Sequence, residues 1–160
     1  MYPNQYVNFT PDSEACKLAL SLLEEDATEQ ESIDTVFQYV TQHVTYDEDK
    51  AATVETGYLP DIDETLSTGK GICFDYAALM TAMLRSRDIP CKLQIGYAGD
   101  IKHAWIDVYI RGKGWVEQAI TYDGEKWNRM DPTFTANSED EELINSYIGD
   151  SANYTLQFTR

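Results

Sequence analysis

Basic residues, cysteines and long apolar runs are all scarce in this sequence. Twelve Lys and Arg residues stand against 28 Asp and Glu residues, which gives a formal net charge of −16 and an isoelectric point near 4.2. Nucleic-acid binding depends on clustered Lys and Arg that replace counterions on the phosphates, so this balance excludes DNA or RNA as a partner. No stretch reaches the roughly 18–20 apolar residues that span a bilayer, so we expect no membrane span.

The three cysteines are too few for a disulfide scaffold. No CxxC or HxxxH pair suggests a metal cage, and no EF-hand-like loop suggests calcium, so we expect no metal and no cofactor. An odd number of cysteines leaves at least one thiol unpaired. The length of 160 residues, with 42% hydrophobic and 12% aromatic residues, is enough for one domain with its own core. We expect a monomer.

Apolar spacing in the first third of the chain predicts two helices. Residues 12–25 carry apolar side chains at helical intervals, and a second helix begins at Thr28. Thr28 and Glu31 form the pattern of a capping box, in which each side chain binds the backbone N–H of the other. Residues 47–64 are polar and contain Gly57 and Pro60, which predicts a long loop.

The remaining chain changes from helical spacing to alternation. Residues 73–87 follow two close glycines and predict a helix that ends before Ile89 and Pro90; Cys73, Ala77, Met80 and Leu84 share one face. Alternating patterns then predict strands in residues 91–95, 103–110, 115–116 and near 127, a short helical piece at 143–148, and a last strand at 154–158. A hairpin turn is expected at Asp123. Helices followed by an antiparallel meander indicate an α+β fold.

Cys73 is the strongest candidate for a nucleophile. It opens a helix after a glycine-bounded turn, where the helix dipole and the N–H groups of the first turn favour the thiolate. A small side chain that merely packs the first turn is the structural alternative. Cys16 lies in the middle of a helix and Cys91 inside an apolar strand, so both fit that alternative well.

A nucleophilic thiol needs a base, and the base needs a third group that fixes its tautomer. The sequence has two histidines, and His43 fits a surface residue at a helix C-terminus. His103 begins a strand after a turn. Asp131 ends a later strand, although an Asp-Pro pair also initiates turns. Asp107 shares the face of His103 but lies too far along the same strand to hold its ring.

Three segments of the chain together resemble the core of the transglutaminase-like superfamily, of bacterial type. They are GKGICFDYAALM around Cys73, HAW at His103, and MDPTF around Asp131, in the family's order. The resemblance covers residues 66–134 closely and the preceding helices more loosely. It implies a papain-like cysteine-proteinase fold, in which the helix of the nucleophile packs on an antiparallel sheet. Cys73 would be the nucleophile, His103 the base and acid, and Asp131 the residue that orients the histidine.

The segment between Trp115 and Asp131 departs from the shorter members of the family, because it carries an additional hairpin-like stretch that contains Asp123. We prefer Asp131 as the orienting residue, since Asp123-Gly124 has the pattern of a turn. We expect a single domain over residues 1–160. It has three parts: a helical part (1–65), a catalytic core (66–134) and a C-terminal loop, short helix and strand (135–160).

The resemblance implies a thiol enzyme that acts on peptide or carboxamide bonds of a protein or peptide substrate through an acyl-enzyme. We expect hydrolysis, as a cysteine peptidase or amidase, because a chain of this length has little material for an amine tunnel that excludes water. Transamidation of protein glutamine is the alternative, and a non-catalytic binding or scaffold module with the same fold is a third. The three candidate residues do not discriminate peptidase from transamidase.

Residues 1–9 lack the basic start and apolar stretch of a signal peptide. The protein is therefore either cytoplasmic, or its targeting segment is absent from this sequence. Similarity to domains of bacterial secreted or lipid-anchored proteins favours an extracytoplasmic location. Whether Cys16 and Cys91 form a disulfide depends on a Cα separation below about 7 Å, which the sequence leaves open.

Overall fold

The computed structural model describes residues 2–98, 101–122, 127–129 and 154–159. Five helices precede the main sheet: α1 (Glu14–Leu22), α2 (Glu29–His43), α3 (Glu48–Thr53), α4 (Ile62–Thr68) and α5 (Cys73–Arg85). The strands are β1 (Thr45–Tyr46), β2 (Lys70–Gly71), β3 (Cys91–Ala98), β4 (Ile101–Ile110), β5 (Gly114–Tyr122), β6 (Trp127–Arg129) and β7 (Tyr154–Thr159). The predicted α+β class is confirmed.

The second predicted helix begins as the sequence indicates. Thr28 is its N-cap: the Oγ1 of Thr28 accepts a hydrogen bond from the N–H of Glu31 (3.2 Å), and the Glu31 carboxylate accepts one from the N–H of Thr28 (2.9 Å). The first helix is shorter at both ends than residues 12–25: it begins at Glu14, after the N-cap Ser13, and its backbone becomes extended at Leu23.

The prediction of a long loop over residues 47–64 was wrong, since α3 and most of the first turn of α4 lie there. Each helix starts at an aspartate whose side chain accepts backbone N–H groups: Asp47 accepts from Lys50, and Asp61 from Asp63 and Glu64. α3 has no buried residue, and α4 buries only Ile62 and Thr65. Helices with so little apolar surface leave no periodic pattern in the sequence.

The main sheet has five antiparallel strands in the order β6-β5-β4-β3-β7. The predicted meander accounts for β3 to β6, and the predicted last strand is β7, which pairs with β3 at the opposite edge from β6. A second, parallel pair joins β1 to β2, a contact that alternation alone did not predict. The predicted turn at Asp123 and the helical piece at 143–148 lie outside the described residues.

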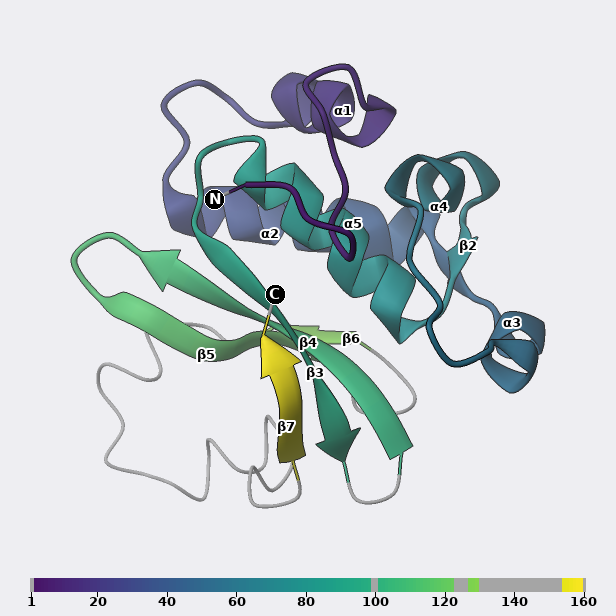
Figure 1. The fold of residues 1–160 in the computed structure, drawn as a ribbon. Coiled ribbons are helices and arrows are strands. Elements are labelled where there is room, and N and C mark those ends of the chain that lie inside the picture. Colours follow the sequence, from purple (N-terminus) through teal and green to yellow (C-terminus); the bar gives the residue numbers. More distant parts are fainter. Residues whose placement is uncertain (1, 99–100, 123–126, 130–153, 160) are drawn as a thin grey trace.

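The core lies between one face of the sheet and the helices that gather above it (Figure 1). α5 is the central element: it packs against β3 and β4 on one side and against α1, α2 and α4 on others. Every residue from Asp75 to Arg85 is buried. The face that was predicted to carry Ala77, Met80 and Leu84 is buried, and so are the other sides of the helix from Asp75 onward.

Candidate functional site

Cys73 is the first residue of α5, as predicted, and its side chain is half-buried. Two features of the preceding backbone, at Gly69 and in β2, lead the chain to this position. Gly69 ends α4 in the left-handed region (φ 63°), which suits glycine. The short strand β2 then pairs with β1 and leads the chain into α5. At the start of α5, the backbone N–H groups and the positive end of the helix dipole favour an anionic side chain.

Gly71 lies where no side chain fits. A Cβ at this position would lie 2.7 Å from the Cβ of Asp75, a distance that side chains do not tolerate. The close approach lets Asp75 turn back over the start of the helix. Its carboxylate accepts a hydrogen bond from the N–H of Ile72 at 2.9 Å. The presence of glycine at 71 and of aspartate at 75 thus has a steric and a hydrogen-bonding reason that is independent of any reaction.

Asp75 is fully buried and binds two side chains from an earlier part of the chain. The Nζ of Lys50 lies 2.8 Å from one carboxylate oxygen, and the hydroxyl of Tyr58 donates to the other at 2.6 Å. Asp75 lies in the first turn of α5, where an acidic side chain favours the helix, and its bond to Ile72 adds to this effect. Sequence reasoning missed Lys50 and Tyr58, because they lie in the segment that was predicted to be a loop.

Lys50 and Tyr58, which donate to Asp75, both keep their protons at neutral pH. Burial tends to lower the pKa of Lys50, but the hydrogen bonds to Asp75 and Tyr58 outweigh it and raise that pKa above its usual value. Burial, and then the hydrogen bond to Asp75, raises the pKa of Tyr58 to about 12. The ring of Tyr58 also meets Phe74 edge-on, with centroids 6.3 Å apart, and Lys50 lies 4.7 Å from the centroid of Tyr58.

His103 lies in β4, where its backbone pairs with Gly96 of β3. Its side chain is outside the described part of the structure. Because α5 packs against both β3 and β4, the helix that starts at Cys73 lies on the strand that carries His103 (Figure 1). Trp105, two residues further, is 5% exposed.

Asp131 and Asp123 both lie outside the described residues, so the choice between them stays a prediction. The described strand β6 ends at Arg129 and pairs with β5. Asp107 is buried in β4, and the side-chain amide of Gln94 donates to its carboxylate at 2.5 Å.

Cys16, Cys91 and His43 were also considered as reactive residues, and each lies in surroundings that suit a structural role. Cys16 and Cys91 are buried, and all three cysteines carry thiols, so no disulfide joins Cys16 to Cys91. Burial raises the pKa of Cys16, and it raises that of Cys91 to about 12. At the end of α2, the ring of exposed His43 stacks on Tyr39 with centroids 4.0 Å apart, and its Nδ1 lies 2.8 Å from the Tyr39 carbonyl oxygen.

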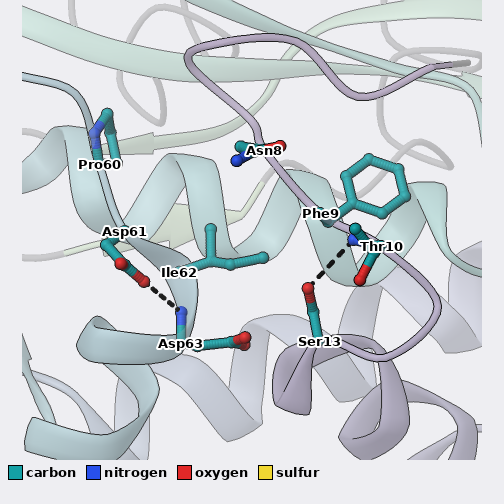
Figure 2. A pocket seen from close by; sticks show the side chains of 8 residues that line it. All are labelled: Asn8, Phe9, Thr10, Ser13, Pro60, Asp61, Ile62 and Asp63. Carbon is teal, nitrogen blue, oxygen red and sulfur yellow. Dashed lines mark hydrogen bonds between the residues drawn. The ribbon is translucent and has the colours of Figure 1, made fainter.

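Among the hollows of the described surface, two involve the segment between α3 and α4. One, of about 200 Å³, lies between the N-terminal segment and the start of α4 and is lined by Asn8, Phe9, Thr10, Ser13, Pro60, Asp61, Ile62 and Asp63 (Figure 2). Its polar groups largely bind one another: Ser13 accepts from the N–H of Thr10, and Asp61 from that of Asp63. The other, of about 430 Å³, is lined by residues 54–58 and Lys50. Only the second borders the groups that bind Asp75.

In the described residues, no helix is long and apolar enough to cross a membrane. The same part of the chain contains no group of three or more His, Cys, Asp and Glu side chains that could hold a metal ion.

Three solved structures share the fold at low sequence identity. A candidate protease from Parabacteroides distasonis is 21% identical, with a TM-score of 0.53 over 65% of this chain and 23% of its own. A candidate cysteine protease from Cytophaga hutchinsonii is 22% identical, with a TM-score of 0.55 over 76% and 39%. A TGase is 19% identical, with a TM-score of 0.51 over 79% and 35%. This chain therefore spans less than half the length of each.

No curated protein matches the chain. The sequence profile of the transglutaminase-like superfamily does match it, over residues 17–132, which is well over half of its length. These residues contain the predicted segments around Cys73 and His103 and extend just past Asp131. The match and the shared fold confirm the resemblance and the papain-like α+β architecture expected from it. The chain belongs to the transglutaminase-like superfamily.

Proposed function

We propose that this domain is a cysteine peptidase or amidase that uses Cys73, His103 and Asp131. The observation that carries the proposal is the place of Cys73: a half-exposed thiol at the first position of a buried helix, which packs on the strand of His103. A helix start stabilises the thiolate, which is the nucleophilic form of cysteine. Membership of a superfamily whose fold is shared with candidate cysteine proteases supports the same chemistry.

The reaction proceeds through two acyl transfers. The Cys73 thiolate attacks the carbonyl carbon of a peptide or carboxamide, and the backbone N–H of Cys73 donates to the developing oxyanion, a contact worth about 2.7–4 kcal/mol. The C–N bond breaks as the His103 imidazolium gives its proton to the leaving amine. His103 then takes a proton from water, whose oxygen attacks the thioester; the C–S bond breaks, the acid leaves, and the Cys73 thiolate and the His103 imidazolium are restored. Asp131 holds the imidazole in the required tautomer.

Water is the second nucleophile in this proposal, which the similarity of the fold to two candidate proteases supports. The test is to incubate the protein with glutamine-containing peptides and a labelled primary amine, and to follow cleavage, deamidation and amine incorporation by mass spectrometry. We expect cleaved or deamidated peptide and, after acid quenching, a transient acyl adduct on Cys73. Cys73→Ala should lose both.

Incorporation of the amine without hydrolysis would replace the peptidase proposal by transamidation and leave the nucleophile in place. No product and no adduct over a broad peptide mixture would favour a binding or scaffold module. The extracytoplasmic location, the monomeric state and the division of residues 1–160 stay predictions.

A further inference from the structure

The segment that contains Lys50 and Tyr58 is anchored to the start of α5 by a buried polar cluster. Residues 51–59 are exposed or half-buried, and α3 buries no residue. Lys50 and Tyr58 nevertheless reach the carboxylate of Asp75, which is fully buried and also accepts the N–H of Ile72. The cluster thus joins three separate parts of the chain at one carboxylate, which lies in the first turn of the helix of Cys73.

Through Asp75 the cluster fixes the backbone beside the nucleophile. The N–H of Ile72 binds Asp75, and the carbonyl of Ile72 accepts from the N–H of Tyr76 at 3.1 Å. The N–H of Cys73 belongs to the same planar peptide unit as that carbonyl, while the N–H of Ile72 belongs to the unit before it. The two bonds therefore hold the two peptide units on either side of Ile72, and the bond to Asp75 restrains the direction of the Cys73 N–H through the backbone of Ile72. In the proposed mechanism this N–H is an oxyanion donor, and its catalytic effect depends on its direction.

The cluster also balances charge beside the thiol. Helix geometry puts the Cα atoms of Cys73 and Asp75 about 5 Å apart. The two side chains do not face each other, but a buried carboxylate without a partner in the same helical turn would still disfavour the thiolate, since like charges raise each other's energy. The ammonium of Lys50, with its side chain 29% exposed, supplies the compensating charge.

We propose that Lys50 and Tyr58 are positioning residues which, through Asp75, hold the Ile72–Cys73 peptide unit and keep the charge around the Cys73 thiolate balanced. In this proposal both residues act through Asp75 and not on the substrate. The effect on reactivity rests on the proposed role of Cys73 as the nucleophile, whereas the effect on the backbone does not.

The experiment uses two probes on the whole chain. Amide hydrogen exchange at Ile72 reports the backbone, and the rate of alkylation of Cys73 by iodoacetamide reports the thiolate. In Lys50→Met we expect exchange at Ile72 about tenfold faster and alkylation about tenfold slower, as for the loss of one charged hydrogen bond or a shift of one pKa unit. Lys50→Arg keeps the charge and should restore most of both. Tyr58→Phe removes only the hydroxyl and should give smaller changes of the same sign.

Lys17→Met is the matched control. Lys17 forms an ion pair with Glu14 at the same 2.8 Å, but on the surface, with side chains 52% and 69% exposed. The Lys17→Met substitution should leave the exchange rate at Ile72 and the alkylation rate of Cys73 unchanged. If Lys50→Met does not fold, Tyr58→Phe alone decides the question.

Slower alkylation separates positioning from plain destabilisation, because loosened packing would speed the alkylation of Cys73 together with buried Cys16 and Cys91. Faster labelling of all three thiols, or both probes unchanged in Lys50→Met and Tyr58→Phe, would overturn the proposal. If Cys73 of the unmodified protein is no more reactive than an ordinary thiol, the proposed function fails. Exchange at Ile72 then still decides whether the cluster holds the backbone.

Discussion

The carboxylate of Asp75 accepts a hydrogen bond from the backbone N–H of Ile72, the residue that immediately precedes Cys73, at 2.9 Å. The bond closes the first turn of α5 from the side chain of its third residue. It thereby connects the local geometry of the candidate nucleophile to groups that are remote in sequence, since Lys50 and Tyr58 bind the same carboxylate.

Replacing Gly71 by alanine should disrupt this turn. The new Cβ would lie 2.7 Å from the Cβ of Asp75, so the backbone or the carboxylate must shift. We expect a loss of about 1–3 kcal/mol in the free energy of unfolding, measured by urea denaturation, together with slower alkylation of Cys73. Gly57→Ala is the control: nothing lies within 4 Å of its added Cβ, although φ is +92°, so its cost comes from backbone strain and should leave Cys73 unaffected. Equal effects of both variants on Cys73 would contradict the steric argument.

The three thiols should react very differently in the native protein. Iodoacetamide at about pH 6 should label Cys73 first, because the thiolate is the reactive form and a helix start favours it. Cys16 and Cys91 are at most 1% exposed, and burial raises the pKa of both, so their thiols stay protonated. Peptide mass mapping measures the three rates, and urea-unfolded protein, in which all three should label alike, is the control. Native labelling of Cys91 as fast as Cys73 would refute the assignment.

Mutation can decide which of Asp131 and Asp123 orients His103. Asp131→Asn should lower turnover at least about a hundredfold, because an amide favours the wrong imidazole tautomer, while substrate affinity changes little. Asp123→Asn, in the predicted turn, should leave turnover within about twofold and serves as the control. The measurement is kcat and KM on a peptide that the unmodified enzyme cleaves. The reverse pattern would move the orienting role to Asp123.

Tyr58 should give the protein a specific sensitivity to alkaline pH. Its folded-state pKa of about 12 lies above the unfolded value of 10.0, so the unfolded chain loses this proton first. The contribution of Tyr58 to the free energy of unfolding is therefore complete below pH 10 and is lost as the pH rises toward 12. Melting temperature measured across this range should fall less steeply in Tyr58→Phe than in the unmodified protein. Tyr2→Phe, at a side chain that is 89% exposed, should reproduce the unmodified slope.

The elements that could be predicted from the sequence are those whose stability is local or whose burial is periodic. Thr28 and Glu31 lie three residues apart, so their capping box could be predicted from spacing alone. Alternation predicted β3, β4 and β7, and the glycines followed by Cys73 predicted the start of α5. The same motif around Cys73, with HAW at His103 and DPT at Asp131, was sufficient to indicate the superfamily.

Tertiary structure alone decided which distant groups meet. The pairing of β7 with β3 depends on long-range hydrogen bonds that alternation does not encode. Lys50, Tyr58 and Asp75 converge because burying one carboxylate requires partners for its charge and its lone pairs, and any segment that the fold brings near can supply them. α3, which carries Lys50, has no buried apolar side chain, so it left no periodic signal in the sequence.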